Sequence, residues 1–262
     1  MIFFRAIKYL KYILLSHHRK GHGIHSPFVF DLVSRVFRNK TNPDTLSTID
    51  LVRKKMISDK RSIQVRDLGS RSVLLKTKTR KVSEIARHSP VPGKYGELLS
   101  NMSVEFGNPL IIELGTSLGI STMYLASSFL KITVCTIEGC PETARIARQN
   151  FKEAGLDNIK ILEGSFDDVL PAFSNMDVKP GLVFIDGNHR KEPVIKYFNL
   201  LAEFSDSKTV IIIDDIYYSK EMADAWYEIK HHWRVSVSID IFRMGILFFR
   251  EGINHNDYII RY

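Results

Sequence analysis

The stretch LIIELGTSLGIS, residues 110–121, has the residue types of a ligand-binding turn. Its apolar start is typical of a strand buried on both faces, and the glycines after it indicate a turn into a helix. A dinucleotide-binding turn needs G-x-G-x-x-G so that a pyrophosphate can approach the backbone, but Ser117 stands at the second glycine position. The carboxylate of Glu113 beside the turn suits a cationic or amine-bearing ligand, although an ordinary strand-helix turn with incidental glycines is an alternative. The residues predicted to bind this ligand are Glu113, Gly115, Thr116, Ser117, Gly119 and Ser121.

A second acid, Glu138, lies 23 positions after Gly115, at the end of the next predicted strand. A carboxylate at this position can accept hydrogen bonds from both hydroxyls of a ribose. Glu138 therefore predicts a cofactor that carries a nucleoside. Enzymes that bind NAD use the same device, so Glu138 alone does not identify the cofactor.

Three carboxylates follow two later predicted strands: Asp186 in the segment FIDGNH, and Asp214 and Asp215 in IIIDDI. Carboxylates that converge on one crevice repel each other unless a proton or cation intervenes, so these acids predict a hard divalent ion such as Mg²⁺ or Ca²⁺. His189 lies three residues after Asp186, and a histidine can act as a base near neutral pH. Helix capping and solvation are the alternative roles of the carboxylates, and a hydrogen bond within the loop is that of His189.

The segments that carry these residues alternate between strand and helix patterns. The predicted strands begin with residues 110–112 and continue with 132–137, 159–162, 182–185 and 210–213. Such alternation gives a parallel sheet with helices on both faces. Two further strand-like runs, Arg234–Phe242 and Met244–Arg250, are joined too tightly for a crossover helix and should pair antiparallel. We predict an α/β fold: a Rossmann-like, doubly wound, seven-stranded, mostly parallel sheet that ends in an antiparallel pair.

The pattern E-x-G-x-x-x-G resembles motif I of the class I S-adenosylmethionine (SAM) dependent methyltransferases, whose sheets characteristically end in such an antiparallel pair. Residues 109–218 are similar to the catechol O-methyltransferase type. The resemblance implies SAM across the first two strand ends, with the methionine part near Glu113 and the ribose on Glu138. Gly164, Ser165 and Phe166, after the third strand, would lie near the adenine, and Asp186 would also border the cofactor. An NAD-dependent dehydrogenase is the weakest rival.

The same resemblance implies a metal-assisted transfer of a methyl group to a hydroxyl of a small molecule. In the family, one Asp and an Asp-Asn pair hold magnesium, and the matching positions here are Asp186, Asp214 and Asp215. Asp215 replaces the family's Asn, which keeps an oxygen ligand but adds a charge. His189 occupies the position of the family's catalytic lysine, so His189 and Asp186 are the predicted catalytic residues.

Charge divides the chain unevenly. Residues 1–100 contain 21 Lys and Arg against 7 Asp and Glu, whereas residues 101–262 contain 16 against 22. We predict a basic N-terminal helical extension or cap over residues 1–106 and a methyltransferase domain over 107–262. A basic half can also bind nucleic acid, so an RNA methyltransferase is one alternative, and a SAM-fold module without catalytic activity is another.

The first segment reads as an amphipathic helix, with Phe3, Ile7, Leu10 and Leu14 at helical spacing. We predict that this face packs on the protein or on a second subunit in a homodimer, with a membrane surface as the alternative. Basic residues interrupt its apolar run, so it is neither a secretory signal nor a membrane span. The two cysteines give no disulfide framework, and the expected compartment is the cytoplasm. Four histidines between residues 17 and 25 complete no familiar ligand spacing, and their role is not predicted.

Overall fold

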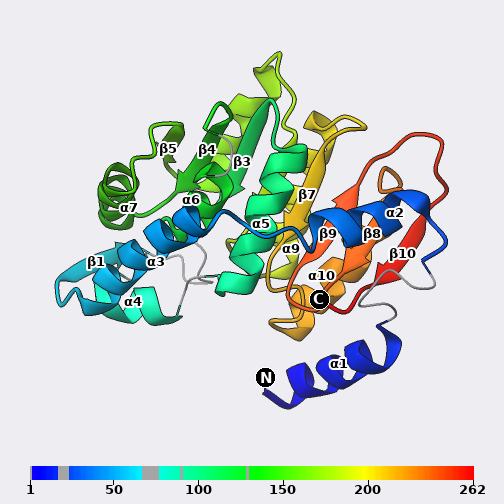
Figure 1. Ribbon diagram of the computed structural model, residues 1–262, viewed down its shortest axis with the longest axis horizontal. Coiled ribbons are helices and arrows are strands. Elements are labelled where there is room, and N and C mark those ends of the chain that lie inside the picture. The colour runs from blue at the N-terminus through cyan, green and yellow to red at the C-terminus, as the bar shows by residue number, and fades with distance from the viewer. Residues whose placement is uncertain (1, 17–23, 67–76, 89–90, 128–129) are drawn as a thin grey trace. The chain divides into compact units, whose positions relative to one another are not determined.

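The computed structural model describes residues 2–16, 24–66, 77–88, 91–127 and 130–262 (Figure 1). The chain forms two compact units: unit 1 is Met1–Asn39 with Lys179–Tyr262, and unit 2 is Lys40–Val178. The predicted boundary between the N-terminal cap and the methyltransferase domain, at residues 106 and 107, does not coincide with the boundary of these units, and it stays a prediction.

Three parallel strands form the centre of unit 2, with β4 between β3 and β5. Their bounds are β3 Leu110–Leu114, β4 Thr133–Glu138 and β5 Ile159–Glu163. Every residue of β3 is buried, as the sequence predicted for a strand covered on both faces. Leu114 pairs with Ile137 and Glu138 with Glu163, so the carboxyl ends of the three strands form one edge of the sheet.

Helices and a hairpin complete unit 2. The helices are α3 Pro43–Ser58, α4 Val82–His88, α5 Gly93–Phe106, α6 Ile120–Ser127, α7 Pro141–Glu153, α8 Phe166–Val169 and the 3₁₀-helix η2 Leu170–Asn175. Helices α5 and α6 pack closely because Gly96 has no side chain: a Cβ there would lie 2.3 Å from a ring carbon of Tyr124. The sequence did not predict the antiparallel hairpin of β1 Ser62–Arg66 and β2 Thr77–Lys81. Residues 67–76, between the two strands, lie outside the described part.

Five strands form the sheet of unit 1, in the order β10-β8-β9-β7-β6. Their bounds are β6 Leu182–Ile185, β7 Val210–Ile213, β8 Val237–Asp240, β9 Gly245–Phe248 and β10 Asn256–Ile259. Strands β6 and β7 are parallel, and β8 and β9 form the predicted antiparallel pair. Strand β10 pairs in parallel with β8 and was not among the seven predicted strands. The chain thus has the predicted α/β fold with a mostly parallel sheet, extended by one edge strand.

The described residues of unit 1 also contain five helical segments. They are α1 Ile2–Leu15, α2 Pro27–Asp31, the π-helix η1 Leu32–Val36, α9 Lys191–Phe204 and α10 Lys220–Lys230. Ser26 caps α2: its hydroxyl accepts a hydrogen bond from the backbone N–H of Val29 at 3.3 Å, and Pro27 occupies the first helical position. Residues 17–23, with three of the four clustered histidines, lie outside the described part.

Helix α1 does not bury its predicted apolar face within the described residues of unit 1, and packing of that face on a second subunit stays a prediction. The side chains of Phe3, Ile7, Leu10 and Leu14 are exposed, by 79%, 40%, 62% and 80%. The helix packs on the rest of unit 1 through its opposite face, which carries the buried residue Tyr12. The Tyr12 hydroxyl donates to the carbonyl of Ile260 at 2.7 Å, and the Tyr12 ring lies 5.4 Å from the ring of Phe242. Aromatic contacts to the C-terminal segment therefore decide which face is covered. Among the described residues, no helix has the length and apolarity to cross a membrane.

Candidate functional site

The predicted cofactor residues of unit 2 gather at the carboxyl edge of β3, β4 and β5. The turn after β3 lies against the end of β4, because the backbone N–H groups of Gly115 and Thr116 both donate to the carbonyl of Ile137, at 3.0 and 3.2 Å. The N–H of Gly164 donates to the carbonyl of Glu138 at 3.0 Å. Three chain segments that are distant in sequence are thus joined at one edge, as expected for the ligand crevice of an open α/β sheet.

The turn itself depends on unusual backbone angles. Gly115, Ser117 and Gly119 have φ of 105°, 49° and 87°, in the region that glycine adopts without steric cost. A Cβ at Gly119 would also lie 2.4 Å from a ring carbon of Phe151 on α7. This glycine therefore lets the start of α6 approach α7, and the pattern of the turn reflects packing as well as ligand access.

Glu138 is held in a fixed orientation by two backbone amides. Its Oε2 accepts from the N–H of Ser117 at 2.7 Å, and its Oε1 from the N–H of Cys140 at 2.9 Å. Burial raises the pKa of Glu138, while these hydrogen bonds act in the opposite direction. An oriented acceptor is therefore presented at the strand end. This geometry fits two neighbouring hydroxyls of a ribose.

Glu113 lies beneath the turn and has no solvent exposure. Its Oε2 accepts from the hydroxyls of Thr122 and Thr136 at 2.5 and 2.7 Å, and Thr136 in turn shares a 2.6 Å hydrogen bond with Thr116. Among the residues that the structure describes, its Oε1 has no hydrogen-bond partner. Burial raises the pKa of Glu113 to about 7, although nearby hydroxyls, including that of Ser121, oppose the shift. Near neutral pH this carboxyl group therefore exchanges a proton and places a partial negative charge under the turn.

After β5, the side chain of Ser165 and the backbone of residues 164–166 have different roles. Ser165 caps the short helix α8: its hydroxyl accepts from the N–H of Asp168 at 3.2 Å and lies 2.5 Å from the carboxylate of that residue. Gly164 has φ of 152°, and Phe166 is half-buried. With the Ser165 hydroxyl committed to the cap, the backbone of residues 164–166 is the part that fits an adenine.

In unit 1, Asp214 follows β7 and is completely buried. Arg243 neutralises it through two parallel hydrogen bonds, from Nε to Oδ1 at 3.0 Å and from Nη2 to Oδ2 at 2.7 Å. Burial opposes the charge on Arg243, but the carboxylates of Asp214, Asp215 and Asp186 outweigh it and raise the pKa of Arg243. Burial raises the pKa of Asp214, and Arg243 opposes that shift. A fixed guanidinium thus balances the cluster of acids.

This arrangement argues against the predicted metal site at Asp186, Asp214 and Asp215. Both carboxylate oxygens of Asp214 are engaged by Arg243, and a divalent ion would have to displace a bidentate ion pair. Among the described residues, the one group of three His, Cys, Asp or Glu ligand atoms within 4.8 Å of one another lies elsewhere, at His231, His255 and Asp257. The three acids therefore do not fit Mg²⁺ or Ca²⁺, because the repulsion that suggested an ion is relieved by an arginine.

His189 and Asp186 are brought together as predicted. Nε2 of His189 lies 3.6 Å from Oδ1 of Asp186, too far for a hydrogen bond. The loop is shaped by Asn188, whose φ is 54° and whose Oδ1 accepts from Nε of Arg190 at 2.8 Å. The ring of Tyr218 lies 5.6 Å from that of His189. A base with a nearby carboxylate and an aromatic neighbour is thus present in unit 1.

Sequence reasoning missed Arg243 and Tyr218. Arg243 lies in the connection between β8 and β9, two residues before Gly245, which pairs with Ile213 at the end of β7. The single cation in the tight connection between two predicted strands was the available signal. Its relation to Asp214 required the register, which the apolar pattern does not specify.

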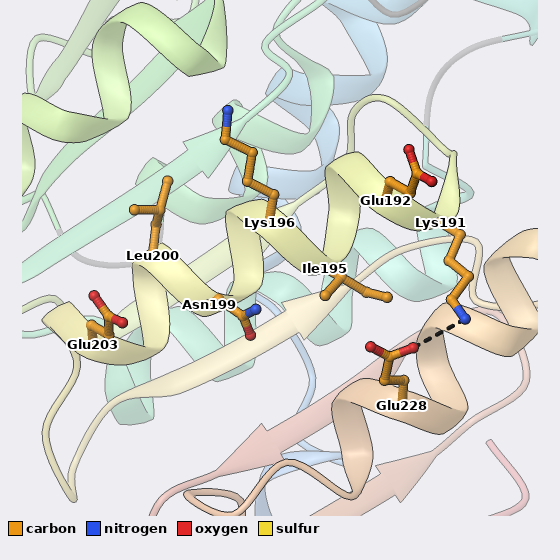
Figure 2. Close-up of a pocket in the computed structure, with 8 residues that line it drawn as sticks. All are labelled: Lys191, Glu192, Ile195, Lys196, Asn199, Leu200, Glu203 and Glu228. Carbon is orange, nitrogen blue, oxygen red and sulfur yellow. Dashed lines mark ion pairs between the residues drawn. The ribbon is translucent and has the colours of Figure 1, made fainter.

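A groove of about 580 Å³ lies on a different part of unit 1 (Figure 2). Charged and apolar side chains of α9 line it together with Glu228 of α10, which forms an ion pair with Lys191 at 3.0 Å. None of the predicted site residues takes part in it. The groove is a surface feature between two helices and does not belong to the candidate site.

Residues 112–216 match the sequence model of a family described as a methyltransferase domain. This segment is similar to a methyltransferase domain. The match begins inside β3 and ends after Asp215, so the matched segment includes all of the predicted site residues. In sequence, the chain is 32% identical over 111 residues to an O-methyltransferase of Aspergillus flavus, covering 40% of this chain and 44% of that protein. The chain spans about half the length of the curated relatives it matches.

Solved structures share the fold of the methyltransferase domain at low identity. The O-methyltransferase from Bacillus cereus in complex with S-adenosylhomocysteine (SAH) has a TM-score of 0.56 at 22% identity, over 84% of this chain and 97% of that one. The SAH-bound methyltransferase of Podospora anserina has a TM-score of 0.58 at 13% identity, over 86% and 97% of the two chains. The predicted class of fold is therefore confirmed.

Proposed function

We propose that this chain binds SAM along the carboxyl edge of β3, β4 and β5 and transfers its methyl group to a hydroxyl of a small molecule. The observation that carries the proposal is Glu138, whose two oxygens are oriented by the amides of Ser117 and Cys140. The residues 115–119 would lie at the methionine part, Glu138 at the ribose, and residues 164–166 at the adenine. The family match and the SAH-bound structural relatives support the identity of this cofactor.

Glu113 favours the cofactor through its charge. The carboxyl group is covered by the turn, so we assign it a positioning role: it holds Thr136 and, through it, Thr116. Bound SAM supplies an electrophilic methyl group on a positively charged sulfur. A carboxylate of raised pKa under the turn stabilises that positive charge when it is ionised.

His189 would accept the proton of the substrate hydroxyl at Nε2. The resulting imidazolium would be stabilised by Asp186 at 3.6 Å. Methyl transfer mainly requires that donor and acceptor be held in line, so one base and a shaped pocket supply what the reaction needs. We assign no step to a metal ion, because Arg243 already balances Asp214.

The N-terminal helix would form part of the acceptor pocket. The guanidinium of Arg5 on α1 lies 6.0 Å from the centre of the Tyr218 ring, and Tyr218 is the aromatic neighbour of His189. Lys8 lies 5.2 Å from the centre of the Tyr217 ring in the same way. These contacts support the cap predicted for the front of the chain, in preference to an arm that binds RNA.

The test is a methyl-transfer assay with labelled SAM and a panel of small phenols, catechols and aliphatic alcohols, measured with and without a chelator. We expect transfer to at least one hydroxyl class that persists in the chelator. His189→Asn should lower kcat with little change in the binding of SAH, because the base acts on the acceptor. If structured RNA is methylated and every small hydroxyl compound is inert, the RNA alternative replaces this proposal.

A further inference from the structure

Three potential metal ligands converge where strand β10 begins. Nε2 of His255 lies 3.1 Å from Oδ1 of Asp257, and Nε2 of His231 lies 3.6 Å from Oδ2 of the same carboxylate. The two imidazole rings are 5.6 Å apart. His231 follows α10, His255 precedes β10 and Asp257 belongs to it, so three points of the C-terminal region meet here.

The other nitrogen of each imidazole is held by a backbone carbonyl. Nδ1 of His231 lies 2.7 Å from the carbonyl oxygen of Tyr227, and Nδ1 of His255 lies 3.0 Å from that of Val235. A carbonyl oxygen only accepts hydrogen bonds, so each Nδ1 carries the hydrogen. In a neutral imidazole the lone pair is then on Nε2, and both lone pairs face a carboxylate. This arrangement is unfavourable unless a proton or a metal ion lies between them.

The carboxylate of Asp257 is also fixed from behind. Its Oδ1 accepts from the hydroxyl of Ser238 at 2.5 Å, and its Oδ2 from Nζ of Lys230 at 2.5 Å. A carboxylate oxygen has two lone pairs, so these bonds leave one on each oxygen. Metal-binding histidines and carboxylates commonly have such outer hydrogen bonds, which set the tautomer and orientation of the ligand.

The strand register separates this cluster from Asp214. Asp257 pairs with Ser238 near the start of β8. The end of β8, at Asp240, pairs with Gly245, which is also the partner of Ile213 next to Asp214. Within the sheet of unit 1, the cluster therefore lies at the end opposite to Asp214.

We propose that His231, His255 and Asp257 bind one Zn²⁺ ion and that this ion fastens the edge strand β10 to the end of α10. Two imidazole nitrogens and one carboxylate oxygen are a zinc ligand set, whereas Mg²⁺ and Ca²⁺ prefer oxygen ligands alone. The side chains of His231 and His255 are 41% and 37% exposed. A water molecule would complete the tetrahedron from the solvent side.

The test is calorimetric titration of the chelator-treated full chain with zinc chloride, with magnesium chloride in parallel. We expect one equivalent of Zn²⁺ to bind, and Mg²⁺ to fail. His231→Ala and His255→Ala should each weaken zinc binding at least about tenfold.

Two controls make the result specific. His88→Ala removes an exposed histidine of α4 and should change nothing. A variant with His17, His18, His22 and His25 replaced by Ala should still bind one equivalent of Zn²⁺ tightly. Zinc should also raise the melting temperature of the wild type and of this variant, but not that of His255→Ala. If no zinc binds, or if binding is lost only with the four N-terminal histidines, the proposal is wrong.

Discussion

The buried carboxyl group of Glu113 should make the stability of the chain depend on pH. Its folded pKa is raised by burial to about 7, against an ordinary value of 4.5. Between these values the folded state binds more protons than the unfolded state, so the free energy of unfolding falls as pH rises from about 4.5 to about 7. One pKa unit corresponds to about 1.4 kcal/mol, so the whole shift is worth about 3 kcal/mol and the part between pH 5 and 8 about 2.5 kcal/mol.

The perturbation is Glu113→Gln, which keeps the shape and an acceptor for Thr122 and Thr136 but cannot ionise. Urea denaturation of wild type and variant between pH 5 and 8 measures the difference. We expect the free energy of unfolding of the variant to gain about 2.5 kcal/mol relative to wild type between pH 5 and pH 8. Glu163→Gln, on the more exposed strand β5, is the matched control and should give a profile parallel to wild type. Parallel profiles for Glu113→Gln as well would refute the account of this buried charge.

Two further predictions concern the other fixed elements of the site. Arg243→Met should lower the free energy of unfolding by about 3–5 kcal/mol at pH 7, because it leaves Asp214 buried and unpaired. This loss of stability should be smaller at pH 5, where Asp214 takes up a proton. Magnesium at about 5 mM, the order of concentration that such sites require, should not change the melting temperature of the wild type. A clear magnesium-dependent rise that Asp214→Asn abolishes would restore the metal site. Gly119→Ala should lower the free energy of unfolding by about 1–3 kcal/mol, because the added Cβ clashes with Phe151 and φ is positive. The control Gly155→Ala, with φ of 69° and no described atom within 4 Å of the added Cβ, should lower it less. Equal losses of stability in urea denaturation would show that the close approach of α6 to α7 is unimportant.

The sequence predicted the strand ends well because their chemistry is local. A run of apolar residues followed by an acid or a glycine marks where a parallel strand leaves the sheet, as at Glu138 and Gly164. Parallel pairing then brings those ends to one edge, which the register of β3, β4 and β5 confirms. These two steps place the predicted cofactor residues at one edge, whereas the resemblance to the methyltransferase family supplied the parts of SAM assigned to them.

The charge balance of the acidic cluster could not be predicted in the same way. Three carboxylates indicate that a positive charge is needed, but not which one. Arg243 is 29 residues from Asp214, and their contact depends on how β9 pairs with β7. A metal ion and an arginine satisfy the same electrostatic requirement, and only the register distinguishes them.

Helix α1 shows a similar limit. The spacing of Phe3, Ile7, Leu10 and Leu14 correctly gave a helix with one apolar face. It did not give the partner of that face, because hydrogen bonds of Tyr12 with the C-terminal segment turn the opposite face towards unit 1. The edge strand β10 escaped prediction because only its last two residues, Tyr258 and Ile259, have strong strand preference.

The most direct measurement of the central claim is calorimetric titration of the full chain and of Glu138→Ala with SAH and with NAD. We predict that SAH binds to one site in the wild type, that NAD does not compete, and that Glu138→Ala weakens SAH binding at least tenfold, as expected for the loss of charge-assisted hydrogen bonds to a ribose. Tight binding of NAD without binding of SAH, or equal SAH affinity of the two proteins, would contradict the assignment of the cofactor site.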